Sequence, residues 1–193
     1  MSLEQIKKIR EITGAGMVDV KKALDEAAGD EVKAVELLRK SGQAKALKKN
    51  DREAKEGVIG SYMHSNNKIG AMVKLYCETD FVARNEEFKE LAKDIAMHIS
   101  AMSPKFLSPE SVPEEMLEKE REIWTEQLKN EGKPAEIMAK IMNGKEKKFK
   151  EEISLLTQPF VKNPDLTISE LITEKIGKIG ENIQLGDFFR FEL

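Results

Sequence analysis

Apolar residues recur at helical spacing along the first 42 residues and predict three short helices. Ser2 and Gln5 form a capping box in front of the first helix, and Gly14 ends it together with Gly16. The apolar side of this helix consists of Leu3, Ile6 and Ile9. The second helix ends at Gly29, and its apolar residues follow the i, i+3, i+4, i+7 spacing: Val20, Ala23, Leu24 and Ala27.

A third helix can begin at Asp30, a residue type that caps helix N-termini, and end at Ser41 and Gly42. Its inward positions are predicted to be Val32, Val35 and Leu38. A core built by about 40 residues is marginal on its own, so such a unit is more often a docking head than the seat of a reaction. The N-terminal part is therefore interpreted as a three-helix module.

A polar, lysine-rich stretch from Gln43 to Lys55 follows and predicts a linker, which can be helical. Its basic residues are Lys45, Lys48, Lys49, Arg52 and Lys55. Asp51 and Glu53 interrupt them, and no aromatic residue stands nearby to stack on a base, so a solvated linker is favoured over a nucleic-acid site. We therefore expect a head plus linker over residues 1–54 and a core domain over residues 55–193.

The hydrophobic period then changes from that of a helix to that of a strand. Residues 69–77 alternate between an apolar face and a mixed face, and the apolar positions are Ile69, Ala71, Val73, Leu75 and Cys77. Residues 58–63 form a second run of this kind, separated from the first by the polar residues 64–68. This pattern predicts a β-hairpin.

Helices are predicted to follow the hairpin. Asn85 begins one that ends at Ser103 and Pro104, and its apolar stripe should cover one face of the hairpin: Phe88, Leu91, Ala92, Ile95 and Ile99. Proline at or near the first helical position marks two more, over residues 113–130 and 134–142, with a turn at Gly132. This pair predicts a helical hairpin.

The last part of the chain is predicted to complete the fold. One helix contains Phe149, Ile153 and Leu156. Thr167 and Glu170 form a capping box for the next, which ends at Gly180 and carries Ile168, Leu171, Ile172 and Ile176. Residues 183–193 alternate again and predict a strand that closes a small antiparallel sheet. The expected class is α+β: a three-helix module followed by a core with a small antiparallel sheet and a helical hairpin.

Composition narrows the function classes without identifying one. Of the 193 residues, 40% are hydrophobic and 35% charged, as in soluble globular proteins, and no apolar run reaches the roughly 20 residues of a membrane-spanning helix. The amphipathic N-terminus does not resemble a signal peptide, so we expect a cytoplasmic protein without a membrane partner. A net charge of −3 argues against direct binding of nucleic acid.

The sequence offers no recognisable catalytic or cofactor-binding machinery. Cys77 is the single cysteine, and the two histidines, His64 and His98, lack a metal-binding or catalytic context. Each histidine is interpreted as a satisfied surface or boundary residue. Gly14 and Gly16 lack the third glycine and the preceding strand of a dinucleotide site, and no phosphate-binding loop occurs. We expect no metal, no cofactor, no bound nucleotide and no covalent chemistry.

The segment from Thr79 to Val82 lies between the predicted strand and the helix that begins at Asn85. A strand-to-helix corner is normally at the surface, so a large aromatic residue there is either core that folds back or a protruding anchor. Phe81 continues the odd-numbered apolar face of the strand, and periodicity alone favours the core. Asp80 either makes a charge contact or caps the turn.

Two longer motifs resemble signatures of the elongation factor Ts family. Residues 77–83 read C-E-T-D-F-V-A and contain the family's T-D-F-V signature. Residues 9–24 read I-R-E-I-T-G-A-G-M-V-D-V-K-K-A-L and are similar to its N-terminal signature L-R-x-x-T-G-A-G-M-x-D-x-K-K-A-L. Residues 180–183, G-E-N-I, resemble a third segment of the family. The likeness therefore extends over essentially the whole chain.

This resemblance implies a ubiquitin-associated-like head on an α+β core and the activity of a guanine-nucleotide exchange factor. The corner residues that it implies for binding elongation factor Tu are Thr79, Asp80, Phe81 and Val82. Of these, Asp80 and Phe81 would enter the GTPase domain, with Phe81 in an apolar pocket near the nucleotide-binding elements. The head residues implied to press on a neighbouring helix of that domain are Arg10, Met17 and Val18. The implied result is a loosening of magnesium and phosphate contacts, so that GDP leaves and GTP can bind.

The chain also departs from the family. Gly186 and Asp187 stand in the last strand where members often carry two basic residues, and Val18 replaces a common methionine. Contacts that those basic residues make elsewhere are therefore not expected here. The chain holds a single core instead of the duplicated core of longer relatives. Because short-core members are expected to pair, the resemblance also implies a homodimer.

Two other interpretations stay open on the residues alone. A ubiquitin-associated-like head that recognises a different partner would give binding without nucleotide release. An enzyme with a site around Glu78, Asp80 and His64 would turn over a small molecule.

Overall fold

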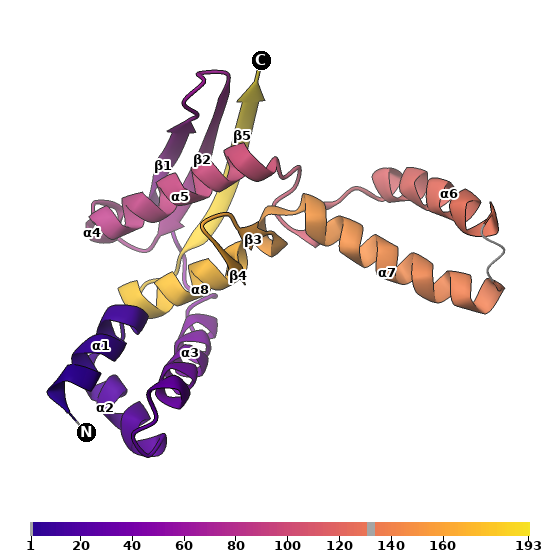
Figure 1. Ribbon diagram of the computed structural model, residues 1–193. Coiled ribbons are helices and arrows are strands. Elements are labelled where there is room, and N and C mark those ends of the chain that lie inside the picture. Colours follow the sequence, from indigo (N-terminus) through magenta and orange to yellow (C-terminus); the bar gives the residue numbers. More distant parts are fainter. Residues whose placement is uncertain (1, 131–133) are drawn as a thin grey trace.

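The computed structural model describes residues 2–130 and 134–193 and combines helices with small sheets (Figure 1). Its α-helices are α1 (Leu3–Thr13), α2 (Met17–Glu26), α3 (Glu31–Leu47), α4 (Asp80–Ala83), α5 (Glu86–Met102), α6 (Glu114–Asn130), α7 (Ala135–Ile153) and α8 (Ile168–Ile179). Single turns of 3₁₀-helix span Pro109–Ser111 and Leu155–Thr157. The strands are β1 (Glu56–Met63), β2 (Ile69–Cys77), β3 (Pro159–Phe160), β4 (Asn163–Thr167) and β5 (Gln184–Glu192). The predicted α+β class is confirmed.

Helices α1, α2 and α3 form the head and enclose a small hydrophobic cluster of their own (Figure 1). Ser2 and Gln5 form the predicted capping box of α1, and the Asp30 carboxylate accepts backbone N–H groups in the first turn of α3. The buried residues of this cluster are Ile6, Ile9, Val20, Ala23, Leu24, Ala27, Ala34 and Leu38. The apolar stripes predicted for the first two helices thus supply most of the head's core, except that Leu3, at the start of α1, is 73% exposed.

Helix α3 differs from its prediction in two ways. Val32 is 71% exposed, because the side of α3 that carries Leu38 faces the cluster instead. The helix also continues through Gly42 to Leu47, where the sequence predicted an end at Gly42. Helix α8 packs against this stretch, and a Cβ atom on Gly177 would lie 3.4 Å from the Gly42 Cα. That packing offsets the roughly 1 kcal/mol by which glycine disfavours a helix interior.

The segment predicted as a solvated linker is tied to its surroundings. Lys45 lies in α3 and pairs with Asp19 of α2 at 2.8 Å. Lys49 Nζ donates to the carbonyl oxygen of Gly180 at 2.6 Å, and Ala46 is buried with the core. The basic side chains are exposed or half-exposed, as a solvated and partly helical segment predicts, but the contacts of Lys45, Ala46 and Lys49 show that the segment is not a free linker. The domain boundary at residues 54 and 55 stays a prediction.

Strands β1, β2 and β5 form an antiparallel sheet in the order β1-β2-β5 (Figure 1). The predicted hairpin is present, and the predicted apolar face of β2 is turned inward, with Ala71 to Cys77 buried on alternate residues. Helix α5 covers this face so closely that a Cβ atom on Gly60 would lie 2.4 Å from the carbonyl oxygen of Ala92. The main hydrophobic core therefore lies between this sheet, α5 and α8.

The other face of the same sheet, which we call the open face, is exposed and apolar. Register places Met72 opposite Phe189 and Gly70 opposite Phe191, and directly opposed residues of antiparallel strands share a face. The large exposed apolar side chains of the open face are Ile59, Met63, Met72, Phe189 and Phe191. The predicted alternation of the last strand is confirmed, and its more apolar side points away from the core.

Helices α6 and α7 pack together as an arm that projects from the core (Figure 1). The predicted helical hairpin is confirmed by this pairing, in which Trp124 and Phe149 meet edge to face with ring centres 5.7 Å apart. Helix α7 continues to Ile153, so the predicted end at Met142 with a separate helix beyond is wrong. Its packing on α6 extends through that stretch. The turn predicted at Gly132 lies outside the described residues.

Strands β3 and β4 form a second, two-stranded sheet that the sequence did not predict. His98 of α5 joins it to the core, because its Nδ1 accepts the N–H of Val161 at 3.2 Å and its Nε2 lies 3.0 Å from Gln158 Oε1. Burial lowers the pKa of His98. The interpretation as a surface or boundary residue is wrong, since His98 is fully buried, although its hydrogen bonds are satisfied as expected.

Helix α8 begins at the predicted capping box of Thr167 and Glu170. It ends at Gly180, whose φ of 91° lies in the left-handed region that glycine adopts without strain. Within residues 2–130 and 134–193, no helix combines the length and the apolarity that crossing a membrane requires.

Candidate partner-binding site

The corner, residues 79–82, links the end of β2 to α5 through the single-turn helix α4. Thr79 caps this helix, because its Oγ1 accepts the N–H of Val82 at 3.4 Å. Val82 packs partly against the core, and Ala83 is buried. Phe81 points the other way and is 81% exposed. The periodicity that favoured a core position is therefore misleading here, because the chain has left the strand at Cys77 and entered a helix.

Asp80 lies beside Phe81 and is half-exposed. Its Oδ2 lies 3.0 Å from Nη2 of Arg84, one helical turn further on. Of the two roles left open for Asp80, capping is wrong, since Thr79 provides the cap. Within the chain its charge contact is to an exposed arginine at the end of the same short helix, and a charge contact with a partner stays a prediction. An exposed ion pair of this kind contributes little to stability, about 1 kcal/mol at most, so Asp80 is free to exchange it for another contact.

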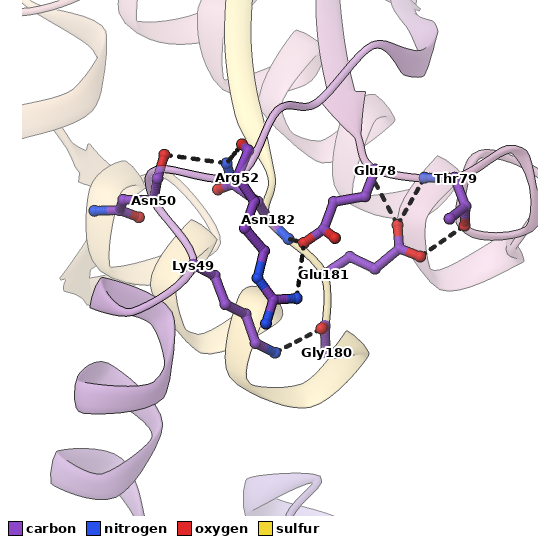
Figure 2. Close-up of polar contacts among 8 residues, drawn as sticks. All are labelled: Lys49, Asn50, Arg52, Glu78, Thr79, Gly180, Glu181 and Asn182. Atoms are coloured by element: carbon purple, nitrogen blue, oxygen red, sulfur yellow. Dashed lines mark hydrogen bonds and ion pairs between the residues drawn. The ribbon is translucent and has the colours of Figure 1, made fainter.

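The loop of residues 180–182, directly after α8, holds the corner in place (Figure 2). Glu181 Oε2 accepts the backbone N–H groups of Glu78 at 3.1 Å and of Thr79 at 3.0 Å. Glu181 Oε1 accepts the hydroxyl proton of Thr79 at 2.6 Å. One carboxylate therefore receives three hydrogen bonds from two consecutive residues. Hydrogen bonds to a charged acceptor are roughly twice as strong as neutral ones.

The same loop is also bound to the segment that follows α3 (Figure 2). The Asn182 side-chain amide donates to the carbonyl oxygens of Asn50 at 3.3 Å and of Arg52 at 2.7 Å. The backbone N–H of Asn182 donates to Glu78 Oε1 at 2.7 Å, and Arg52 Nη1 lies 3.5 Å from the same oxygen. Head, loop and corner thus meet at one junction. The sequence marked residues 180–183 only as a family resemblance and gave no partner for them.

The residues of the enzyme hypothesis are not assembled into one site. His64 lies in the hairpin turn before β2, whereas Glu78 and Asp80 follow the other end of that nine-residue strand. A strand of this length spans about 25 Å. Cys77 is buried, and burial together with the Glu181 charge raises the pKa of its thiol to about 11. A thiol of that pKa is protonated at neutral pH and is a poor nucleophile.

The three head residues assigned by resemblance are all exposed. Arg10 lies near the end of α1, and Met17 and Val18 open α2, with exposures of 54% and 66% for the last two. Both side chains stay exposed at the N-terminal end of α2, before its first buried residue, Val20. The head therefore offers a second exposed surface with apolar and positively charged groups.

Gly186 and Asp187, the two positions of the last strand that depart from the family resemblance, each contact a residue of β2. Asp187 Oδ2 pairs with Lys74 Nζ at 2.7 Å, and this contact lowers the pKa of Asp187 and raises that of Lys74. Gly186 lies so close to Tyr76 that a Cβ atom there would come within 2.6 Å of the ring. A basic residue at either position would not fit the contacts of this chain.

The described residues contain no group of three or more His, Cys, Asp or Glu side chains placed to hold a metal ion. The structure is thus that of an α+β protein with a three-helix head and a candidate partner-binding corner, on which an aromatic side chain is exposed. The family model described as "Elongation factor TS" matches residues 5–193.

Curated relatives agree with that match. Elongation factor Ts of Carboxydothermus hydrogenoformans is 54% identical over 190 residues, which cover 98% of this chain and 88% of the relative. That of Fervidobacterium nodosum is 53% identical and covers 100% of this chain and 98% of the relative. That of Thermodesulfovibrio yellowstonii is 52% identical, with coverages of 100% and 96%. The chain therefore belongs to the elongation factor Ts family of translation elongation factors.

Proposed function

We propose that this chain is a guanine-nucleotide exchange factor that binds elongation factor Tu carrying GDP and promotes release of the GDP, so that GTP can bind. Membership of the elongation factor Ts family supports the partner and the activity. The single observation that carries the mechanism is Phe81, a large apolar side chain that is 81% exposed. Isolated exposure of a phenylalanine on a structured corner is typical of an anchor that a partner buries.

The proposed mechanism is insertion of Asp80 and Phe81 near the nucleotide-binding elements of the partner. Burying a phenylalanine side chain is worth roughly 1.5–3 kcal/mol. If that contact forms only when nucleotide contacts are loosened, it weakens nucleotide binding by about tenfold to a hundredfold. Because the corner is already ordered by Thr79 and Glu181, little of this free energy is lost in fixing its conformation.

Thr79 and Val82 complete the proposed contact surface in different ways. Thr79 is exposed and caps the turn, while Val82 is half-buried beside the core. Asp80 would give up its exposed contact with Arg84 and make one in the partner. The head residues Arg10, Met17 and Val18 would form a second contact, which adds affinity without touching the nucleotide site.

The proposal requires no covalent step and no cofactor. A protein that weakens GDP binding by a given factor must itself be bound more weakly by the same factor when GDP is present. Exchange therefore follows from binding alone, in the cytoplasm where translation elongation takes place. We also propose that the head with its linker ends at residue 54 and that residues 55–193 act as one core.

A homodimer through the open face is the second part of the proposal. Five large apolar side chains are exposed there, and the ion pair that lies among them, Lys74 of β2 with Asp187 of β5, is neutralised within the chain. An apolar sheet face of this kind can pack on a copy of itself across a twofold axis, because such an interface uses the same patch twice and sheets pack face to face about 10 Å apart. The second copy is favoured over a charged partner because the face offers little unpaired charge.

The experiment that tests the exchange function uses elongation factor Tu loaded with a fluorescent GDP. Addition of this chain and an excess of unlabelled GDP should speed the loss of fluorescence in proportion to the concentration of the chain, up to saturation. Bovine serum albumin at equal concentration is the control. An unchanged rate of GDP release would contradict the proposal, and binding without faster release would support the alternative of a head that only docks.

A further inference from the structure

We propose that Glu181 is a positioning residue for nucleotide exchange, which holds the corner so that Phe81 is presented to the partner. This inference rests on the proposed function. Glu181 would not touch the partner's nucleotide itself, because its two carboxylate oxygens are taken up by Glu78 and Thr79. It would act through the backbone of the corner.

The first support is the way strand pairing ends before the corner. The pairing of β1 with β2 stops at Glu56 and Cys77, and that of β5 with β2 stops at Gln184 and Tyr76. The N–H groups of the next two residues therefore have no strand partner and need another acceptor. Glu181 Oε2 accepts both, at 3.1 and 3.0 Å. The carboxylate thus replaces a neighbouring strand at the point where the sheet ends.

The second support is the short length of α4. A helix of four residues is not stable on its own, because it makes too few hydrogen bonds to offset the cost of ordering its backbone. Thr79 provides its cap, and Glu181 Oε1 accepts the hydroxyl proton of Thr79 at 2.6 Å. This contact orients the hydroxyl so that an oxygen lone pair remains for the N–H of Val82. Glu181 therefore fixes both the entry and the cap of the turn that carries Phe81.

The third support is that Glu181 is itself held from behind (Figure 2). Asn182 is only 1% exposed, and its side chain donates to two backbone carbonyl groups in the segment after α3. Lys49 Nζ donates to the carbonyl oxygen of Gly180 on the other side of Glu181. Both neighbours of Glu181 are thus anchored to the same segment. Because both of its neighbours are fixed, the Glu181 carboxylate can restrain the corner instead of moving with it.

The test compares Glu181→Ala with a matched control, Glu170→Ala. Glu170 lies near the other end of α8 and makes the same kind of contact, since Oε2 accepts the N–H and the hydroxyl proton of Thr167 at 2.8 and 2.9 Å. Loss of Glu181 should lower the maximal rate of GDP release about tenfold or more, since misplacing a functional group by about 1 Å can cost as much as about a hundredfold. The concentration of chain for half-maximal rate should change less than about twofold, because the head contacts remain. Glu170→Ala should change neither quantity.

A conservative variant separates positioning from general stability. In Glu181→Gln, the amide oxygen can still accept the two backbone N–H groups, so most of the maximal rate should return. Amide hydrogen exchange should show faster exchange at Glu78 and Thr79 in Glu181→Ala and unchanged protection in α1 to α3. Should the alanine variant not fold, Glu181→Asp replaces it, since the carboxylate is kept and its reach is shorter by one methylene; the same loss of maximal rate is expected.

A double variant shows whether Glu181 acts through Phe81. If it does, GDP release from elongation factor Tu should be no slower with the double variant Phe81→Ala, Glu181→Ala than with the slower of the two single variants, because both changes remove the same contact. Additive losses, a normal rate in Glu181→Ala, or an equal loss in Glu170→Ala would overturn the inference. If wild-type chain does not speed release, the proposed function fails; if Phe81→Ala is slow and Glu181→Ala is not, only the role of Glu181 fails.

Discussion

The corner and the open face both expose apolar side chains, but they differ in number and in support. The corner presents one large side chain, Phe81, on a turn held by a carboxylate from a distant loop. The open face presents five, on three strands held by a regular hydrogen-bonded sheet. A single held anchor suits insertion into a pocket, whereas a broad apolar face suits a flat partner. Exposure of an apolar side chain therefore does not identify a function by itself, because the contacts that hold the side chain in place decide what kind of partner surface it fits.

The largest expected effect is a difference in folding stability between substitutions on the open face of β2 and on its covered face. Met72 and Val73 are neighbours in β2, with exposures of 45% and 1%. Val73→Asp places a carboxylate in the core, and since burial can raise a carboxyl pKa by about 3–5 units, it should destabilise the fold by roughly 4 kcal/mol or more. Met72→Asp should cost less than about 1 kcal/mol within one chain. Thermal unfolding measures both, and equal losses would show that the open face is part of a core.

The next effect concerns self-association. Phe191→Asp places a charge at the proposed twofold interface and should raise the Kd of the homodimer by about 30-fold or more, the effect of losing roughly 2 kcal/mol. Size-exclusion chromatography with light scattering over a dilution series measures it. Phe81→Ala, which alters the corner alone, is the matched control and should leave the Kd unchanged. A wild-type chain that is monomeric at high micromolar concentration would refute the dimer.

The smallest expected effect is a pH dependence of the folding stability that comes from His98, on the side of the sheet that α5 covers. Burial lowers the pKa of His98 from its ordinary value of 6.5, so the unfolded chain binds the proton more readily. The neutral side chain therefore stabilises the fold above about pH 6.5, and this contribution is lost as the pH falls below that value. The carboxylates with lowered pKa values, such as Glu87 and Glu170, lose their contribution only below their ordinary 4.5.

Urea unfolding at pH 7.5 and 5.5 checks this prediction. The wild-type chain should be less stable at the lower pH, and His98→Asn, whose side-chain oxygen can still accept the N–H of Val161, should lose less over the same interval. An equal loss in both proteins would assign the pH dependence to other groups. Phe81 has no titrating side chain, and the open-face pair of Asp187 and Lys74 keeps its charges over this interval, because its pKa values are shifted further below 3.8 and above 10.5. Neither GDP release nor dimer formation by the folded protein should therefore change in parallel with His98.

The sequence predicted most of the secondary structure where the local signal was strong. The capping boxes at Ser2 and Thr167 and the alternation of β2 all correspond to elements of the fold. It misplaced the ends of α3 and α7, because packing against α8 and α6 carries both helices past glycines that local propensity treats as stops. Strands β3 and β4 were missed, since two to five residues give too little pattern.

The candidate site was predictable only in part. Periodicity assigned Phe81 to the core, and the family resemblance assigned it to the surface, where it lies. Glu181 could not be found from local patterns, because it contacts residues about one hundred positions earlier in the chain. Its neighbour Asn182 likewise gives no sign in the sequence that it is buried. Such long-range polar contacts depend on the complete fold.

The rate of GDP release from elongation factor Tu, measured with the wild-type chain and with Phe81→Ala, shows whether Phe81 drives exchange. With Phe81→Ala, GDP should leave elongation factor Tu at least about tenfold more slowly than with the wild-type chain, the effect of roughly 1.4 kcal/mol. The circular dichroism spectrum and the thermal midpoint of the variant should be unchanged. Val161→Ala, which removes an exposed apolar side chain outside both regions, should release GDP at the wild-type rate. An unchanged rate in Phe81→Ala, or a large fall in its thermal midpoint, would contradict the account.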